Sequence, residues 1–334
     1  MRIGSCFSGV GGLDLAVEAA GLGRLAFCVE WQVFQTRVLD RHWPGAKKFR
    51  DIEAVTGREV PKVDILVGGF PCTGFSKAGK GMGLRNEQSH RWFDMLRIIE
   101  AQRPVGVLLE NVRALLRDRF AHDLATIYEG LRALGYTVDA PLAIDSFELG
   151  APHHRERVFL VATRGTVHAS AFEAVRPPLV ESVKDLYPAP RGMPPKPGEP
   201  PRTLVKHQRY PHKESRLLSL GNAVVPDMGR EAALHLRKRL LGEPPLTEPR
   251  LPNIDRTAPP LGYRAPARFW PTAITTDAKG SRRATARADH WTSNEGESLT
   301  DAVWLNDPAD YDRPLNPDWS EALMGFPRGW TLPE

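Results

Sequence analysis

Residues 2–21 read RIGSCFSGVGGLDLAVEAAG, and this stretch decides the fold. Its first part, RIGSCFS, is a short apolar run typical of a β-strand, and GGLDLAVEAAG at 11–21 is a glycine turn followed by helical apolar spacing. Glycines between a strand and a helix let a ligand approach the backbone where the helix begins. The stretch therefore predicts the first strand–turn–helix unit of an α/β domain.

The same alternation of strand and helix patterns continues to residue 164. Further strands are predicted at 25–31, 63–72, 105–112, 137–145 and 157–164, and helices at 33–43, 89–104 and 122–136. Pro44 ends the second helix, and Gly135 ends the fourth. This pattern predicts a mostly parallel sheet covered on both faces, with ligands bound beyond the carboxyl ends of its strands.

Composition limits the class of protein. A chain of 334 residues with 41% hydrophobic residues can form one large α/β domain and a smaller second one. The net charge of +5 suits a polyanionic partner without requiring one. The sequence has no apolar run near the ~20 residues of a membrane span and no signal-peptide pattern. Three cysteines without a CxxC pair argue against disulfides and a metal site, and fit a reducing cytoplasm.

Polar residues that could bind a cofactor follow the first strands. The spacing of Gly9, Gly11 and Gly12 is GxGG, which disfavours the GxGxxG site of a nicotinamide enzyme. Glu30 ends the second strand, where a carboxylate can accept hydrogen bonds from ribose hydroxyls. Asp51 and its neighbour Ile52 could contact an adenine amino group and ring. Each acid alone is more often a solvated loop residue, but together they predict a nucleoside-bearing cofactor without a pyrophosphate.

A candidate nucleophile lies in GGFPCTGFS at residues 68–76. Cys72 ends the third predicted strand, where its thiol would face the ligand cleft. Pro71 restrains the backbone before it, and we expect the glycines at 68, 69 and 74 to clear space around the thiol. The alternative is a cysteine that serves as a small buried hydrophobic residue, which is the usual case.

Charged residues end or begin the neighbouring strands. Glu110 and Asn111 end the fourth long strand, so a carboxyl is expected at the same edge as Cys72, where it could donate a proton to a ring nitrogen. The alternative is a cap on the following helix. Arg155 and Arg157 would point to one face of a strand and could anchor a base carbonyl, a phosphate or the carboxylate. The alternative is a pair of surface charges.

These motifs together resemble those of the cytosine-5 DNA methyltransferases. They are FSGVGG (7–12), GGFPC (68–72), ENV (110–112), RER (155–157) and GNAVVP (221–226), where the last opens an amphipathic helix. The resemblance implies the S-adenosylmethionine-dependent methyltransferase fold: an α/β, mostly parallel, doubly wound sheet with an antiparallel last strand, plus a smaller irregular target-recognition domain.

The resemblance also implies roles for individual residues. Cys72 would attack carbon 6 of a cytosine flipped out of duplex DNA, while Glu110 protonates ring nitrogen 3 and Asn111 holds the local geometry. Arg155 would orient the base, and Arg157 would hold the carboxylate. The positions that match contacts to S-adenosylmethionine are Phe7, Gly9, Gly11, Glu30, Trp31, Asp51, Ile52, Pro71, Asn222 and Val224. Residues 76–90 match the mobile loop that closes over DNA.

The chain departs from the family pattern in two places. His153 stands where the arginine motif usually has glutamine, and we expect activity to survive because histidine also donates and accepts hydrogen bonds. The second departure is the order of the motifs, because LMGFP (323–327), which resembles a motif that usually precedes GNxVxP, here follows it.

The reordering leads to five predicted segments. They are a catalytic and cofactor-binding domain (1–164), a proline-rich connection (165–210), a segment that returns to the catalytic domain (211–242), a target-recognition region (243–315) and a C-terminal segment (316–334). The target-recognition assignment uses the basic and aromatic residues Arg264, Arg268, Phe269, Trp270, Lys279, Arg282, Arg283, Arg287 and Trp291. Its alternative is a basic, partly disordered tail.

The sequence predicts a cytoplasmic monomer of prokaryotic or phage origin that acts on double-stranded DNA. One alternative is an RNA (tRNA) cytosine-5 methyltransferase, because it would share the Cys72 and Glu110 motifs. Another is a catalytically silent DNA-binding homologue. Cys72, Glu110, Arg155 and Arg157 are all present, which argues against the silent homologue.

Overall fold

The structure is a computed structural model that describes residues 1–75, 81–174, 187–204, 210–252, 269–271, 273, 299–306 and 313–333. The chain divides into two compact units, which are described separately. Unit 1 comprises Met1–Ile144, Glu156–Pro178 and Met228–Pro252. Unit 2 comprises Asp145–Arg155, Leu179–Asp227 and Asn253–Glu334. The five segments predicted from the sequence stay predictions.

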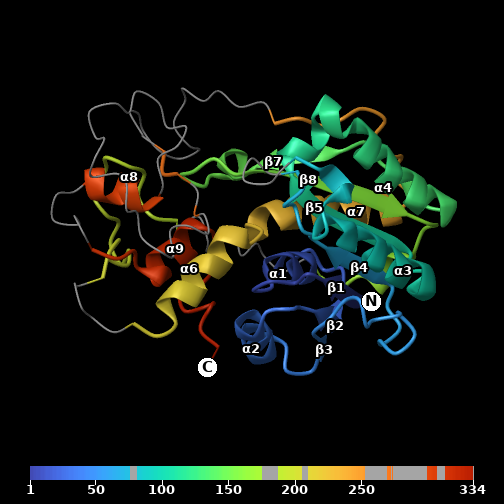
Figure 1. The fold of residues 1–334 in the computed structure, drawn as a ribbon, viewed down its shortest axis with the longest axis horizontal. Helices are drawn as coiled ribbons and strands as arrows, with labels where there is room; N and C mark the ends of the chain where they lie inside the picture. Colours follow the sequence, from blue (N-terminus) through green and yellow to red (C-terminus); the bar gives the residue numbers. More distant parts are fainter. Residues whose placement is uncertain are drawn as a thin grey trace. The chain divides into compact units, whose positions relative to one another are not determined.

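Unit 1 is built on one sheet with the strand order β3-β2-β1-β4-β5-β8-β6, and β7 also pairs with β8 (Figure 1). The strands are β1 (Arg2–Cys6), β2 (Arg24–Val29), β3 (Lys47–Phe49), β4 (Ile65–Gly68), β5 (Gly106–Val112), β6 (Thr137–Val138), β7 (Leu142–Asp145) and β8 (Glu156–Thr163). The pairs from β3 to β5 are parallel, and β8 is antiparallel to both β5 and β6. The predicted α/β fold with an antiparallel last strand is confirmed.

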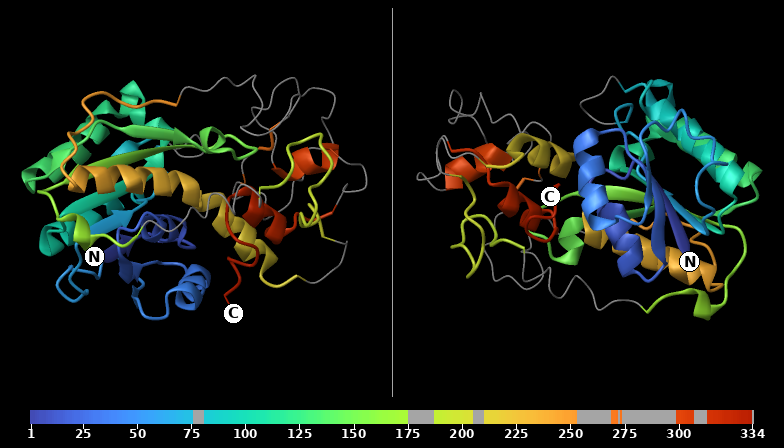
Figure 2. Two further views of the ribbon diagram at one scale, coloured as in Figure 1. Left: turned by 180° about the vertical axis from the view of Figure 1, so that it is seen from behind. Right: turned by 90° about the horizontal axis from the view of Figure 1, so that it is seen from below.

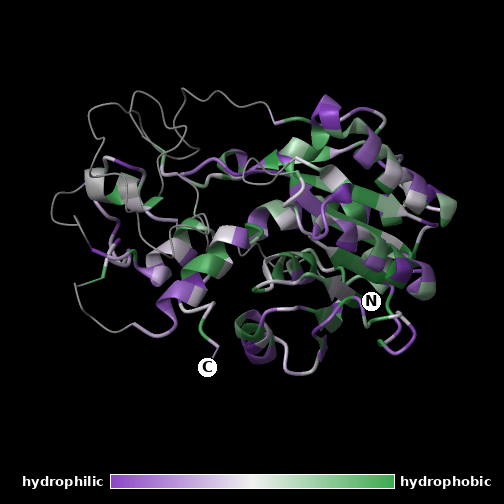
Figure 3. Cartoon of the chain, in the orientation of Figure 1, coloured by the Kyte–Doolittle hydropathy of each residue, from purple (hydrophilic) through white to green (hydrophobic). Residues whose placement is uncertain are grey.

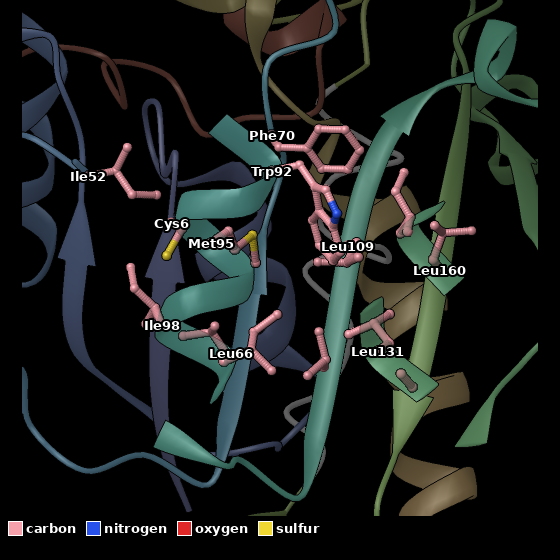
Figure 4. Packing of buried hydrophobic residues seen from close by; sticks show 14 of the residues in the cluster. Cys6, Ile52, Leu66, Phe70, Trp92, Met95, Ile98, Leu109, Leu131 and Leu160 are labelled. Carbon is pink, nitrogen blue, oxygen red and sulfur yellow. The ribbon is translucent and has the colours of Figure 1, made fainter. Parts of the chain in front are cut away.

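One face of the sheet packs against α3 (Trp92–Gln102) and α4 (Ala121–Ala133). Alternate strand residues point toward these helices, as period-2 strand geometry requires. Figure 4 shows Cys6, Leu66 and Leu109 on this face, against Met95 and Ile98 of α3. The strands are correspondingly the most hydrophobic part of the unit (Figure 3).

The opposite face carries α7 (Pro226–Leu240), which crosses the sheet in the view from behind (Figure 2). Leu236 lies 3.1 Å from the point where a Cβ on Gly106 would stand, so the helix packs directly on β5. The buried carboxylate of Asp139 fixes this helix by accepting hydrogen bonds from Arg239 Nε at 2.9 Å and from His235 Nε2 at 2.7 Å. The remaining helices of unit 1 are α1 (Gly12–Ala19) and α2 (Val33–His42).

The structure differs from the predicted elements in a few places. The single strand expected at 137–145 is split into β6 and β7, because Pro141 lacks the N–H that a continuous ladder needs. The short edge strand β3 was not predicted, since its Lys47 and Lys48 give no apolar pattern. The helix predicted after GNAVVP is α7, whereas α6 (Lys213–Asn222) before it was not predicted.

Unit 2 contains α6, α8 (Leu299–Asn306) and α9 (Pro317–Leu323). Arg216 of α6 is 0% exposed. Arg216 Nη2 donates to Asp318 Oδ1 at 2.7 Å and to Glu321 Oε1 at 2.6 Å, and Nε donates to Thr331 Oγ1 at 2.9 Å. This ion cluster joins α6 to α9 and to the C-terminal segment. Among the described helices of both units, none is long and apolar enough to cross a membrane.

The cluster predicts unequal effects for two arginines that share Asp318. We expect Arg216→Ala to lower the free energy of unfolding by about 3–5 kcal/mol, because it leaves Glu321 buried without its cation and removes the buried partner of Asp318. Arg328 also pairs with Asp318, at 2.9 Å, but its side chain is 67% exposed, so Arg328→Ala should cost less than about 1 kcal/mol. Urea denaturation of both variants measures this difference, and equal losses would contradict it.

Candidate active site

The parallel strands of unit 1 bring the predicted site residues of that unit to one edge. β1 and β2 end shortly before Gly9 and Glu30, β4 leads into the loop that carries Cys72, and Glu110 lies near the end of β5. These four strands are neighbours in the order β2-β1-β4-β5. Their carboxyl ends are where ligands bind in sheets of this kind.

The turn after β1 has an unusual backbone. Phe7, Gly9 and Gly11 all have positive φ angles, of 59°, 57° and 82°, and a residue with a side chain such as Phe7 rarely adopts this conformation. The backbone N–H groups of Phe7 and Ser8 both donate to Val29 O, which locks the turn to β2. Among the described residues other than its chain neighbours, none has an atom within 4 Å of the point where a Cβ on Gly9 would stand, whereas a Cβ on Gly11 would collide with Trp43. Gly9 therefore leaves room for a ligand, and Gly11 is required by packing.

Glu30 connects this turn to the end of β2. Its Oε2 accepts a hydrogen bond from Gly9 N and its Oε1 accepts one from Gln32 N, each at 2.8 Å. Burial raises the pKa of the Glu30 carboxyl, although the two backbone hydrogen bonds act in the opposite direction. Each carboxylate oxygen keeps a second acceptor site, so the group can still receive ribose hydroxyls.

The residues beside Glu30 offer surface for a nucleoside. Trp31 is 65% exposed, which is uncommon for so large an aromatic side chain. Ile52 is buried in the core (Figure 4), and half-buried Asp51 accepts a hydrogen bond from Glu53 N at 2.9 Å. An open glycine turn, a carboxylate and an exposed indole fit a nucleoside-bearing cofactor.

Cys72 differs from the other two cysteines in its surroundings. It is partly exposed, whereas Cys6 and Cys28 are buried within the sheet. Burial raises the pKa of the Cys6 thiol far above its ordinary value and that of Cys28 to about 12, which makes both thiols inert. Cys72 O accepts a hydrogen bond from Phe75 N at 2.8 Å, so the cysteine begins a tight turn. Its environment excludes the alternative of a small buried hydrophobic residue.

The glycines around Cys72 clear space for groups other than the thiol, which corrects our expectation. A Cβ on Gly68 would lie 2.6 Å from Cys6 O, and one on Gly69 would lie 2.7 Å from Glu110 Oε2. A Cβ on Gly74 would collide with Gly83 O. These glycines permit close approach of β1, of the Glu110 carboxylate and of residues 81–85.

Glu110 forms an ion pair with Arg157. Glu110 Oε1 lies 2.9 Å from Arg157 Nε, and the two side chains are only 12% and 17% exposed. The antiparallel register of β5 and β8 places Arg157 opposite Val112, two residues beyond Glu110. The N-cap residue of the helical turn that follows β5 is Val112, and the Glu110 side chain instead forms the ion pair with Arg157.

Asn111 lies next to this pair and holds the loop that carries Cys72. Its side chain is buried, and its Nδ2 donates to Phe70 O at 3.1 Å. Its Oδ1 accepts from Val112 N at 2.9 Å. The amide therefore links the end of β5 to the residues just before the nucleophile.

Arg155, Asn222 and Val224 fall in unit 2. The Arg155 guanidinium is buried and donates to Gly221 O at 3.1 Å, Ala223 O at 2.7 Å and Ala273 O at 3.3 Å. These bonds hold the GNAVVP turn, in which Asn222 is exposed and Val224 half-buried. Arg155 and Arg157 are both largely buried, so neither is a surface charge. Arg155 lies just before β8, which begins at Glu156. The bonds from Arg155 to the turn were not predicted from the sequence.

The expectation for Trp270 as a base-reading residue is wrong. Trp270 is 1% exposed, donates from Nε1 to Ala189 O at 2.8 Å and packs edge-on against Trp319. Its ring is therefore part of the hydrophobic core of unit 2 and is not available to a base. Phe269 packs against Phe147 and His154. Buried His153 pairs by its backbone with Trp270. The other basic and aromatic residues named for target recognition, and residues 76–80 of the predicted loop, lie outside the described residues.

Comparison with known proteins places the chain in a family. The model of the C-5 cytosine-specific DNA methylase family matches residues 1–334. The chain belongs to this family. The type II methyltransferase M.NgoBI of Neisseria gonorrhoeae is 35% identical over 155 residues, which cover 46% of this chain and 48% of that protein. M.Bsp6I of a Bacillus strain is 32% identical over 189 residues, covering 56% and 60%.

A third relative, the type II methyltransferase M.HaeII of Haemophilus aegyptius, is 34% identical over 171 residues, covering 51% of this chain and 52% of that protein. The chain thus spans about half the length of the curated relatives it matches. In unit 1, Cys72 follows β4 and Glu110 lies near the end of the neighbouring strand β5.

The sequence reasoning missed one buried acid beside the cofactor turn. Asp14, in the first turn of α1, is fully buried. Burial raises the pKa of its carboxyl to about 7, although the hydroxyl of Ser5 acts in the opposite direction. Asp14 follows Leu13 at the start of a helix, where an acidic residue is ordinary, so the sequence gives no sign that its carboxyl is buried.

This carboxyl predicts a pH dependence of stability. Its pKa rises from 3.8 to about 7 on folding, so the folded chain holds the proton more tightly and stability falls as pH rises across this range. We expect Asp14→Asn to be more stable than the parent by up to about 4 kcal/mol at pH 8, and by little at pH 4. Thermal unfolding at both pH values measures this.

Asp40→Asn is the control, because the Asp40 side chain is 59% exposed. It should change stability by less than about 1 kcal/mol at either pH. A loss of stability in Asp14→Asn that is equal at pH 4 and pH 8 would contradict the assignment.

Proposed function

We propose that the protein transfers a methyl group from S-adenosylmethionine to carbon 5 of cytosine in duplex DNA. The observation that carries the proposal is the meeting of Cys72 and the Glu110–Arg157 ion pair at the strand ends of a sheet whose chain belongs to the C-5 methylase family. The names of the relatives, type II methyltransferases, support the same reaction.

The turn after β1 and the end of β2 would hold the cofactor. Glu30 would accept hydrogen bonds from the ribose hydroxyls, and Trp31 and Ile52 would contact the adenine ring. Gly9 provides open space beside them. When bound, S-adenosylmethionine supplies an electrophilic methyl group on a sulfonium sulfur. The predicted contacts of Phe7, Gly11, Asp51, Pro71, Asn222 and Val224 rest on the family resemblance.

The chemistry proposed for the chain begins with Cys72. Its thiolate forms a bond from Sγ to carbon 6 of cytosine, and Glu110 delivers a proton to ring nitrogen 3, so that the electron pair displaced from the 5,6 double bond makes carbon 5 nucleophilic. Carbon 5 takes the methyl group as the bond from that group to the cofactor sulfur breaks and leaves a neutral thioether. Loss of the carbon 5 proton to a base then reforms the double bond and expels Cys72 as thiolate, and ring nitrogen 3 returns its proton to Glu110.

Two groups would keep this machinery in place. Arg157 holds Glu110 Oε1. The role of Arg155 in orienting the base stays a prediction from the family resemblance. Asn111 restrains the loop before Cys72. Because a stacked base cannot reach a thiol at a sheet edge, the cytosine must be flipped out of the duplex. Recognition of the DNA sequence by residues 243–315, the monomeric state and the cytoplasmic location stay predictions.

The proposal predicts which substitutions stop methylation. In bisulfite sequencing of a plasmid expressed with the protein, the parent chain should protect cytosines at one recurrent sequence. We expect Cys72→Ser to abolish protection, and Glu110→Gln to slow methyl transfer by about 10²–10⁴-fold, because it removes the proton donor. Cys28→Ala is the control, since Cys28 is a buried cysteine of β2, and it should retain activity.

A parallel assay with labelled methyl donor separates DNA from RNA as the substrate. Duplex DNA and tRNA are incubated with the parent chain and with Cys72→Ser. Label on DNA that depends on Cys72 supports the proposal, whereas label on tRNA alone, or no bisulfite protection by the folded parent chain, would refute it.

A further inference from the structure

The turn that carries Cys72 is bound on both sides by one buried hydroxyl. Ser89, just before α3, is 0% exposed. Its Oγ donates to Pro71 O at 2.8 Å and accepts from Gly74 N at 2.9 Å. Pro71 precedes the nucleophile and Gly74 follows it by two residues, so a single side-chain atom closes the segment from 71 to 74.

This arrangement needs a group that is both donor and acceptor. A hydroxyl supplies one O–H and two lone pairs, which matches the carbonyl of Pro71 and the N–H of Gly74. An alanine at 89 would leave the buried Gly74 N–H and the Pro71 carbonyl without this partner, and such groups are costly to bury. We expect the backbone of residues 71–74 to change conformation so that these two groups regain hydrogen-bond partners.

The position of Ser89 is itself fixed by its neighbours. Ser89 N donates to Asn86 Oδ1 at 3.3 Å, and His90 N donates to Asn86 O at 2.8 Å. The adjacent Gln88 accepts from Thr73 Oγ1 at 2.7 Å, which is a second link to the Cys72 turn. Residues 86–90 therefore act as a rigid support beside the turn.

We infer that Ser89 is a positioning residue for the Cys72 thiol: its hydroxyl sets the conformation of residues 71–74 and so the direction in which Sγ leaves the backbone. Ser89 touches neither substrate nor cofactor in this role. The inference rests on the proposed function for the consequence in methyl transfer, but the geometry of the turn stands independently of it.

Two measurements on Ser89→Ala test the inference. The first is the rate at which iodoacetamide alkylates each cysteine, read by peptide mass spectrometry on the full chain. Releasing the turn exposes a thiol that is now only partly exposed, so we expect Cys72 to react about 3–10-fold faster, as local opening predicts. Cys6 and Cys28, both buried, should stay protected and report any global unfolding.

The second measurement is steady-state methyl transfer. We expect kcat to fall by about 10–100-fold, because small misplacement of a reacting group has effects of this size. The KM for S-adenosylmethionine should change less than kcat, because Ser89 holds only one predicted cofactor contact, Pro71, and its hydrogen bonds do not reach the turn after β1. Ser320→Ala is the matched control: Ser320 is also a buried serine with a hydrogen bond from Oγ to a backbone carbonyl, and it should leave both readouts unchanged.

The outcomes separate this inference from the proposed function. Selective acceleration of Cys72 alkylation supports the positioning role even if the parent chain methylates no DNA, in which case the proposed function alone fails. Unchanged alkylation of Cys72, or equal acceleration of Cys6 and Cys28, would overturn the inference. An unchanged kcat in an active protein would overturn it as well.

Discussion

The parallel pairing of β2, β1, β4 and β5 is the constraint on which the rest of unit 1 depends. Because these strands run in one direction, the residues that follow them meet at a single edge of the sheet. Glu30 and Cys72 are 42 residues apart in the sequence, and the pairing of the strands that precede them brings both to this edge. The antiparallel strand β8 starts where β5 ends, so it can deliver Arg157 to Glu110 at that edge.

Hydrogen bonds of modest energy then refine this arrangement. Asn111 binds Phe70 O, and Ser89 binds Pro71 O and Gly74 N, so the backbone on both sides of Cys72 is held by side chains from two other elements. Each bond contributes only about 0.5–1.5 kcal/mol to stability. Their larger effect is on geometry, because the thiol must approach a ring carbon from a defined direction.

The sequence was sufficient to predict the mostly parallel sheet from apolar periodicity, and its antiparallel last strand from the family resemblance. The sequence also placed Cys72 and Glu110 at the ends of two strands, and these strands, β4 and β5, are neighbours in the sheet. It was not sufficient for Ser89, Asp14 or Trp270. Ser89 acts on residues 15–18 positions earlier in the chain, and no local pattern encodes such a contact. Trp270 lies in a basic, proline-rich region that resembles a surface, yet its indole is buried by contacts with distant residues such as Trp319.

The most direct test of the account is to trap the protein on duplex DNA in which 5-fluorocytosine replaces cytosine and to identify the attached residue by peptide mass spectrometry. Fluorine at carbon 5 cannot leave as a proton does, so a nucleophile bonded to carbon 6 stays attached after methyl transfer. The account predicts one adduct, on Cys72, that requires S-adenosylmethionine. Attachment at another residue, or no adduct from folded protein on DNA that contains its target sequence, would contradict it.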